Sequence, residues 1–296
     1  MDFYNLGPVT WWESQCFYHA LAAMGREGLI LCYPMTPYVC LGLHDDLDQE
    51  INRRYCRDRK IPLLRRETGG GVVYLDRHQL FFQLVLHRAN SLLPLRRQLF
   101  YETFLNPAIA VCRGLGIPAE LKGPSDIVVN DRKCSGNAAG DIGPSVAYVG
   151  NLLLKFDYKA MSEVLRVPSA AYRRGLYRAL QLHMTTLSDW VVQLPAYSDL
   201  AGALAEEYAR YLGGLTPRSP DRELRDNAWK ARRRLTSEEW LSLSGRRRAE
   251  RAVKIAEGVF LIERNLGGRS AGVLIRDGVG RENPLVEEPG FDFMGG

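Results

Sequence analysis

The stretch that decides the fold is Arg65-Arg66-Glu67-Thr68-Gly69-Gly70-Gly71, which stands between two predicted strands. Three consecutive glycines cost conformational entropy, so they mark a place where the backbone needs positive φ or where a ligand approaches closely. Successive N–H groups of such a loop can face one concavity that suits a phosphate or a carboxylate. The two arginines add fixed positive charge in a planar donor fork. The alternative is a tight turn between strands with two surface arginines, and the spacing matches neither a Walker A loop nor a Rossmann fingerprint.

A second stretch, SDIVVNDRKCSGNA at residues 125–138, predicts a β-hairpin. Its turn is Asn130-Asp131, because both residue types tolerate turn geometry. The hairpin places Asp126 and Lys133 on its two arms. A lysine in such a site would stabilise the charge that develops when a carboxylate attacks phosphorus, and an ordinary hairpin lysine is the alternative. Strand alternation points Cys134 away from the face of Lys133, which favours a buried thiol over a nucleophile.

Together and in this order, the two stretches resemble the lipoate–protein ligase A family, and the resemblance runs across most of residues 10–213. Residues 61–76 are similar to the family's approach to an RRxSGGG or RRxTGGG motif. Residues 126–138 are similar to its D-hydrophobic-N-x-R-K-x-S-G-x-A motif. The resemblance implies the α+β fold that biotin ligases and octanoyltransferases share, a mixed β-sheet with helices packed on it.

The resemblance also implies an activity and a site. The enzyme would use ATP to activate lipoate or octanoate as an acyl-AMP, and would then pass the acyl group to a lysine of a lipoyl carrier protein. Lys133 would contact the acyl carbonyl and the α-phosphate, with Mg²⁺ bridging the phosphates, and Asp126 would serve the adenylate or the metal ion. The carrier would be a 2-oxoacid dehydrogenase E2 domain, a glycine-cleavage H protein or a more specialised lipoyl carrier. The other residues implied for the lipoyl and nucleotide pocket are Arg66, Thr68, Gly69, Gly70, Gly71, Val73, Ser135, Gly136 and Ala138.

The chain departs from the family's pattern at three places. Leu75 and Val149 stand where the family has histidine, and His78-Gln79-Leu80 stands where it has Gly-Asn-Leu. These departures concern acyl binding and the choice of acceptor. Residues 141–149 contain no cysteine, whereas octanoyltransferases of this fold form a cysteine thioester there. A ligase is therefore favoured over an ATP-independent octanoyl or lipoyl transferase, and a non-catalytic adaptor that binds lipoate or a carrier is the third hypothesis.

Alternating helices and strands are predicted along the rest of the chain. Gly213-Gly214 and the prolines that follow mark a boundary, which predicts a catalytic domain at residues 1–214 and a basic linker with a small accessory domain at 215–296. The ending Gly290-Phe291-Asp292-Phe293 resembles the Gly-Asp-Phe-Phe of the family's accessory domain. Helices are predicted at 13–26, 47–60, 95–115, 158–165 and 199–212, and strands at 29–33, 38–43, 62–64, 72–75, 80–86, 148–156, 256–263 and 271–276.

The charge of the chain is uneven. Its formal net charge is +5, and residues 217–254 hold twelve basic and six acidic residues. Because the basic and acidic residues alternate and few aromatics accompany them, a solvated helical face is favoured. A docking face for an acidic carrier is the second hypothesis, and a nucleic-acid site is the third.

Composition excludes several classes of protein. With 296 residues, 46% hydrophobic and 25% charged, the chain is not disordered. No apolar run reaches the roughly 18 residues that cross a bilayer, and the first residues lack the pattern of a signal peptide. The six cysteines show no CxxC spacing and the five histidines no HxxxH pair. We therefore expect free buried thiols in a reducing cytoplasm and no metal-ligand cluster.

Overall fold

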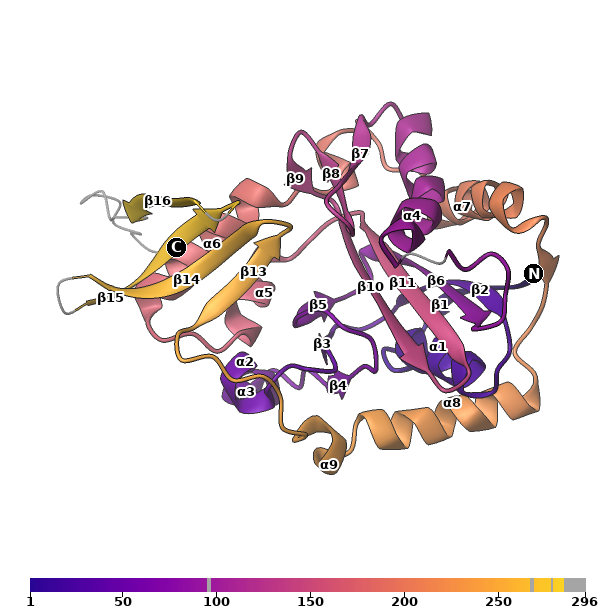
Figure 1. The fold of residues 1–296 in the computed structure, drawn as a ribbon, viewed down its shortest axis with the longest axis horizontal. Helices are drawn as coiled ribbons and strands as arrows, with labels where there is room; N and C mark the ends of the chain where they lie inside the picture. The colour runs from indigo at the N-terminus through magenta and orange to yellow at the C-terminus, as the bar shows by residue number, and fades with distance from the viewer. Residues whose placement is uncertain (95–96, 267–268, 278, 285–296) are drawn as a thin grey trace.

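A mixed six-stranded sheet forms the centre of the protein. The fold is that of a computed structural model, which describes residues 1–94, 97–266, 269–277 and 279–284 (Figure 1). In the sheet, β1 runs parallel to both of its neighbours and the other pairs are antiparallel. The predicted mixed sheet with packed helices is confirmed. In spatial order the strands are β10 (Ser135–Ile142), β11 (Ser145–Leu153), β6 (Gln79–His87), β2 (Gly28–Pro34), β1 (Asp2–Val9) and β12 (Thr216–Pro217).

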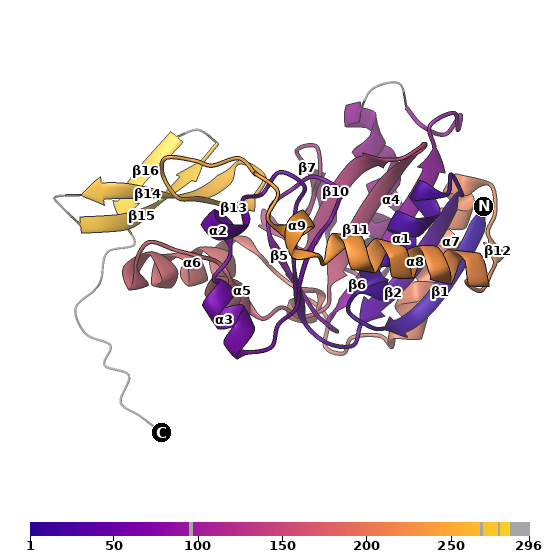
Figure 2. The same cartoon turned by 90° about the horizontal axis from the view of Figure 1, so that it is seen from below.

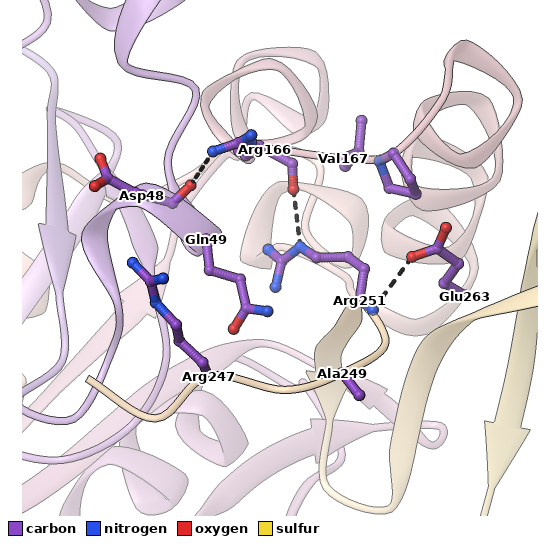
Figure 3. Close-up of a pocket in the computed structure, with 9 residues that line it drawn as sticks. Asp48, Gln49, Arg166, Val167, Arg247, Ala249, Arg251 and Glu263 are labelled. Carbon is purple, nitrogen blue, oxygen red and sulfur yellow. Dashed lines mark hydrogen bonds between the residues drawn. The ribbon is translucent and has the colours of Figure 1, made fainter. Parts of the chain in front are cut away.

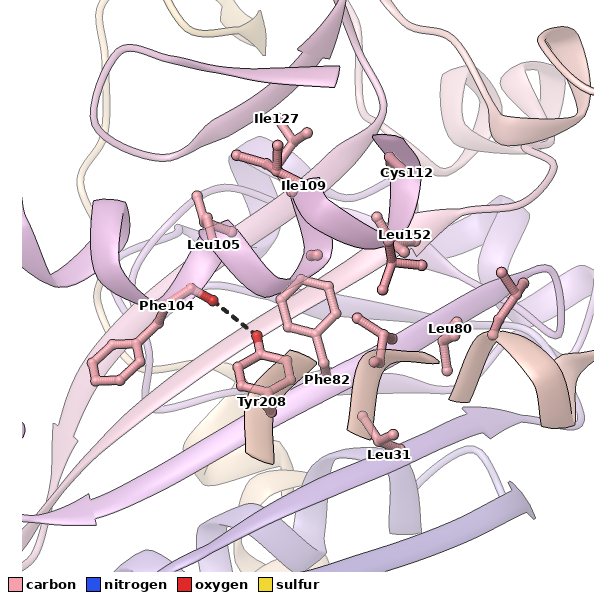
Figure 4. Close-up of a cluster of buried hydrophobic side chains, with 14 of the residues drawn as sticks. Leu31, Leu80, Phe82, Phe104, Leu105, Ile109, Cys112, Ile127, Leu152 and Tyr208 are labelled. Carbon is pink, nitrogen blue, oxygen red and sulfur yellow. Dashed lines mark hydrogen bonds between the residues drawn. The ribbon is translucent and has the colours of Figure 1, made fainter. Parts of the chain in front are cut away.

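Helices cover both faces of this sheet, and the alternation of side chains along β6 explains why. Phe82 packs with α4 (Arg97–Gly114) and α7 (Tyr197–Leu212), where the Tyr208 hydroxyl donates to the carbonyl oxygen of Phe104 at 2.8 Å (Figure 4). Phe81 points to the other face and packs with α1 (Glu13–Ala23) and α8 (Arg222–Leu235). Since side chains alternate along a strand, an apolar strand such as β6 needs cover on both sides.

Two small sheets flank the central one, and each carries one of the sequence motifs. The first has the order β4-β3-β5, formed by β4 (Leu63–Arg65), β3 (Tyr38–Leu41) and β5 (Val73–Leu75). The second has the order β7-β8-β9, formed by β7 (Ala119–Lys122), β8 (Asp126–Val129) and β9 (Arg132–Lys133). The predicted hairpin is confirmed, because its turn residues Asn130 and Asp131 have φ values of 48° and 62°.

A four-stranded antiparallel sheet follows near the C-terminus and packs on α6 (Ala170–His183), beside α5 (Tyr158–Val164) (Figures 1 and 2). A turn at Glu257 and Gly258 separates its first two strands, inside the range predicted as one strand. The predicted ending at residues 290–293 lies outside the described residues. The strands are β13 (Ala252–Ala256), β14 (Val259–Leu266), β15 (Arg269–Arg276) and β16 (Val279–Pro284).

Packing continues across the predicted domain boundary at residue 214. β12 pairs with β1, and α8 lies across α1 (Figure 2). The buried face of α8 has the spacing of an amphipathic helix and consists of Leu224, Ala228, Ala231 and Leu235. On its outer face the guanidinium of Arg232 lies 4.4 Å from the ring of Trp229 and 5.0 Å from that of Trp12. Part of the basic segment is therefore packed rather than solvated.

The prediction of one continuous helix at residues 47–60 is wrong. The segment is split into α2 (Leu47–Glu50) and α3 (Arg53–Asp58). Ile51 forms a β-bridge with Leu165, and the Asn52 side chain accepts from the amide of Tyr55 at 3.2 Å and caps α3. A pairing distant in sequence thus overrides the local helical spacing.

Several elements have no counterpart among the predicted ones. They are β1, β7, β10, β12, β16, α6, the 3-10 helix η1 (Leu187–Asp189) and α9 (Glu238–Leu241). The helix α8 lies in the basic segment, for which the sequence favours a helical face. The six cysteines are free and buried, as predicted. In the part of the chain that the structure describes, no helix combines the length and apolar character needed to cross a membrane.

Candidate active site

The glycine-rich loop connects β4 to β5 and is shaped by the side chain of Arg66. Its Nε and one terminal nitrogen donate to the carbonyl oxygen of Gly69 at 3.2 and 2.7 Å, and the same terminal nitrogen donates to that of Gly71 at 3.0 Å. The other terminal nitrogen donates to the carbonyl oxygen of Cys40 at 3.2 Å. The buried guanidinium therefore draws the loop's carbonyl oxygens inward. Its predicted contact with substrate stays a prediction.

The amide groups of the last two loop glycines are unpaired among the described residues. Gly70 and Gly71 are exposed, and within the described residues their N–H groups donate to no protein acceptor. Gly70 has φ +87°, and a Cβ there would meet Arg66 at 2.9 Å. A Cβ on Gly42 would lie 1.9 Å from the carbonyl oxygen of Gly70, so both positions require glycine. Adjacent free N–H groups on a bent backbone form the kind of concavity that binds anions.

The loop rests on β10, and this contact brings the two motifs together. The amide of Gly69 donates to the carbonyl oxygen of Ala139 at 3.3 Å. A Cβ on Gly140 would lie 2.9 Å from Cα of Thr68, and one on Gly70 would lie 4.0 Å from Cβ of Ala138. Because β10 begins two residues after Lys133, the loop and the lysine are connected by one short strand.

Lys133 and Asp126 meet across the hairpin. The Nζ of Lys133 lies 2.8 Å from Oδ1 of Asp126, and the amide of Glu257 donates to Oδ2 at 2.7 Å. The Asp126 side chain is 3% exposed and that of Lys133 is 18% exposed. The carboxylate is thus satisfied on both oxygens, while the lysine retains an exposed edge.

The predicted metal role of Asp126 stays a prediction. Both oxygens of Asp126 are already engaged, and no cluster of three or more His, Cys, Asp or Glu side chains occurs among the residues that the structure describes. Mg²⁺ commonly takes one or two carboxylates together with substrate phosphates and water. The predicted metal role of Asp126 would require it to release Lys133 or the amide of Glu257.

Cys134 does not offer a nucleophile. Its thiol is buried and donates to the carbonyl oxygen of Ile127 at 3.5 Å. Burial raises the pKa of this thiol well above its usual value. Since the thiolate is the reactive form, the thiol is structural here.

The remaining predicted residues lie near this site in different environments. Ser135 is buried, and the amide of Gly136 donates to Oδ1 of Asn151 at 2.7 Å. Val73 pairs with Cys40 at the edge of the first small sheet.

The departures from the family pattern form one structural unit. Nδ2 of Asn151 donates to Oε1 of Gln79 at 2.6 Å, and both residues are buried. Leu75 and Val149, at the positions of the missing histidines, pack in or against the apolar cluster under α1. The pairing of Gln79 with Asn151 joins β6 to β11, and no local pattern in the sequence indicates it.

His19 on α1 supports the loop and was missed by sequence analysis. Its Nε2 accepts from the amide of Glu67 at 3.1 Å, and its Nδ1 lies 2.8 Å from the carbonyl oxygen of Gln15. Burial lowers the pKa of His19 to about 4. The ring is therefore neutral near pH 7, with Nδ1 as donor and Nε2 as acceptor.

A cavity of about 330 Å³ lies elsewhere, between α2, the segment after α5 and the segment that leads into β13 (Figure 3). The Arg251 side chain donates to the carbonyl oxygen of Arg166 at 2.8 Å and pairs with Glu50 at 2.7 Å. Arg166 in turn donates to the carbonyl oxygen of Asp48 at 2.6 Å. None of the predicted site residues lines this cavity.

Comparison with known proteins places this arrangement in a family. Residues 11–209 match the family model described as the lipoyl protein ligase A/B catalytic domain. The chain belongs to this family. The matched residues of this lipoyl ligase-type domain contain both motifs, the hairpin and four strands of the main sheet, whereas β1 and β12 lie outside the matched range.

Relatives and solved structures agree with the family assignment. The chain is 26% identical over 167 residues to lipoate–protein ligase 1 of Staphylococcus aureus, covering 56% of this chain and 49% of the relative. It spans about half or less of the length of the curated relatives it matches. A bi-partite lipoate protein ligase from Thermoplasma acidophilum, studied with its E2 lipoyl domain, has a TM-score of 0.71 at 19% identity, covering 84% of this chain and 98% of that one. A lipoate–protein ligase A bound with ATP has a TM-score of 0.67 at 20% identity, covering 82% and 98%. At these identities the structural likeness shows a shared fold.

Proposed function

We propose that this protein is an ATP-dependent lipoate–protein ligase. The observation that carries the proposal is the meeting of the two motifs along β10. The glycine loop, with its unpaired amides at Gly70 and Gly71, rests on this strand, and Lys133 lies two residues before the strand begins. The names of the relatives, the ATP bound to one structural neighbour and the lipoyl domain studied with another support it.

The chemistry assigned to the chain is electrostatic positioning. The lipoate carboxylate oxygen attacks the α-phosphorus of ATP, the bond to pyrophosphate breaks, and lipoyl-AMP forms. A carrier lysine then attacks the acyl carbon, losing a proton and releasing AMP. The loop amides and Lys133 would stabilise negative charge at the reacting phosphate and carbonyl oxygens.

Lys133 would exchange partners during the reaction. In the structure its Nζ is paired with Asp126, which would keep the ammonium group in place before substrate arrives. A phosphate or carboxylate oxygen would then compete with Asp126 for this ammonium group. We propose that Mg²⁺ arrives with the phosphates of ATP, because this ion commonly binds substrate phosphates together with water and one or two carboxylates.

We further propose the setting of the reaction. The carrier is a lipoyl domain of an E2 subunit, an H protein or a specialised lipoyl carrier, and six free thiols are typical of a reducing cytoplasm. The sheet of β13 to β16, within the predicted accessory region 215–296, contacts the catalytic hairpin through the amide of Glu257 and Asp126. We propose that this contact opens and closes as substrate exchanges.

Pyrophosphate release tests the activation step. The protein is mixed with ATP, Mg²⁺ and lipoate, with octanoate and with neither acid. The proposal expects release that depends on the acid. A folded protein that releases no pyrophosphate with either acid would contradict it, and acyl movement between carriers in nucleotide-free buffer would favour a transferase.

A further inference from the structure

The segment that follows α7 is fastened to the glycine loop by an ion pair. Both terminal nitrogens of Arg234, in the last turn of α8, donate to the Glu67 carboxylate, at 3.0 and 2.6 Å. The Glu67 side chain is 18% exposed and that of Arg234 is 45% exposed. Two parallel N–H···O bonds to one carboxylate fix direction as well as distance.

The next helix, α9, contacts the first residue of the glycine-loop motif, Arg65. The indole N–H of Trp240 donates to the carbonyl oxygen of Arg65 at 3.0 Å, and the guanidinium of Arg234 lies 4.7 Å from the Trp240 ring. In return the buried Arg65 donates to the carbonyl oxygens of Leu241 and Leu243 at 2.6 and 3.2 Å. The loop and the segment of α8 and α9 therefore hold each other.

Glu67 is consequently held at both its carboxylate and its backbone. Arg234 takes the carboxylate, and His19 accepts from the amide. Gly69 follows two residues later and is anchored on β10. The contacts at Glu67 and Gly69 thus restrict the backbone that leads to the unpaired amides of Gly70 and Gly71.

We propose that Arg234 is a positioning residue for the glycine loop: its pair with Glu67 keeps the loop in the geometry that binds the acyl and phosphate groups. The inference rests on the proposed ligase function. Arg234 lies beyond residues 11–209, the range that matches the family model. The x position of the family's RRxTGGG pattern is Glu67 here, so this chain joins a variable position of the motif to a helix outside the matched domain.

The expected effect is on binding rather than on turnover. When only a fraction of molecules holds the binding-competent loop, the apparent dissociation constant rises in inverse proportion to that fraction. Because a partly exposed ion pair contributes modestly to stability, loss of Arg234 should raise the KM for lipoate about three- to tenfold. The kcat should change less than about twofold, since Lys133 is untouched.

The test compares Arg234→Gln with Lys230→Gln, which removes the same charge one turn earlier on the exposed face of α8. Pyrophosphate release gives KM for lipoate and kcat, and hydrogen exchange reports on the amides of Glu67 and Gly69. We expect Arg234→Gln alone to raise KM and to speed the exchange of both amides. The double variant Glu67→Arg with Arg234→Glu should restore part of the KM.

Three outcomes would overturn the proposal. The first is equal kinetics and equal hydrogen exchange in Arg234→Gln and Lys230→Gln. The second is a decrease of kcat in Arg234→Gln with no change in KM. The third is a KM of the double variant that is higher than the combined effects of the single variants Glu67→Arg and Arg234→Glu predict. If the unmodified protein releases no pyrophosphate, the proposed function fails by itself. Hydrogen exchange then still decides whether Arg234 holds the loop.

Discussion

The glycine loop and the ammonium group of Lys133 are held in different ways. The loop is fixed by contacts from several elements: Arg66 within the loop, His19 on α1, β10 beneath it, and α8 and α9 outside it. The backbone at Lys133 is also fixed, because its carbonyl oxygen accepts from the amide of Thr185 at 2.8 Å and β9 pairs with β8. The ammonium group of Lys133, in contrast, is held among the described residues by its ion pair with Asp126, whose other oxygen accepts from the amide of Glu257.

The difference agrees with the roles that the proposed function gives to the two parts. Anion binding by backbone amides needs a geometry fixed in advance, because reorganisation during the reaction would cost free energy. A lysine whose ammonium group binds first a protein carboxylate and then a substrate oxygen needs an ion pair that it can exchange. The loop is thus built as a rigid cradle, whereas the hairpin presents a cation that substrate can take from Asp126.

Replacing Lys133 should have the largest effect on activity. Lys133→Ala removes the only charge that we assign to the reacting oxygens, and loss of such an electrostatic contact costs about 10²- to 10³-fold in rate. Pyrophosphate release measures this, and circular dichroism checks the fold. The control is Lys122→Ala, which removes a lysine at the end of the neighbouring strand β7 that pairs with the turn residue Asp131. A Lys133→Ala variant as active as Lys122→Ala would remove the lysine from the mechanism.

Adding one methyl group at Gly42 should break the rigid region. The Cβ would lie 1.9 Å from the carbonyl oxygen of Gly70, and backbone must move to admit it. We expect Gly42→Ala to lower the free energy of unfolding by about 3 kcal/mol and to weaken lipoate binding. The control is Gly202→Ala inside α7, where a Cβ meets nothing within 4 Å; it should raise stability by about 0.5–1 kcal/mol. Urea unfolding distinguishes them, and equal stabilities would show that the loop is not tightly packed.

The loop should also be sensitive to acid through His19. The unfolded chain binds a proton at this ring below about pH 6.5, whereas the folded protein, with a pKa of about 4, does not. Stability from this group is therefore present above pH 6.5 and is lost as the pH falls towards 4, by roughly 2–3 kcal/mol. Among the charged groups near the ring, Glu67 raises the pKa of His19, whereas Arg66 and Arg234 lower it.

Urea unfolding between pH 4 and 7 checks this expectation. His19→Gln should show a flatter dependence on pH than the unmodified protein, and His44→Gln, at an exposed histidine, should keep the original slope. If all three proteins share one slope, protonation of His19 does not weaken the loop.

The smallest effect is expected at the turn of the hairpin. Arg276 on β15 lies 3.3 Å from Asp131, with both side chains at least 40% exposed. Such a surface pair contributes little, so Arg276→Gln should change the free energy of unfolding by less than about 0.5 kcal/mol. A loss comparable to that of Gly42→Ala would mean that the hairpin is as firmly held as the loop.

Local features of the site could be predicted from the sequence. Asn130-Asp131 specifies a hairpin because both residues tolerate positive φ, and the hairpin then brings Asp126 to Lys133. The triple glycine indicates a special loop because side chains are excluded there. Both signals lie within a few residues of the chemistry that they position.

Features that depend on distant partners could not be predicted. Glu67 and Arg234 are separated by 167 residues, and no local pattern links them. The break between α2 and α3 depends on the pairing of Ile51 with Leu165, which a helical spacing over residues 47–60 conceals. Likewise, the sequence of α8 shows a charged segment, and it does not show that α1 covers the apolar face of this helix.

The most direct test measures the intact mass of an E2 lipoyl domain after incubation with the protein and lipoate, with and without ATP and Mg²⁺. An ATP-dependent ligase adds one lipoyl group to the domain only when ATP is present, and the Lys133→Ala variant adds none. A domain that stays unmodified with ATP, or one that is modified equally without it, would contradict the assignment.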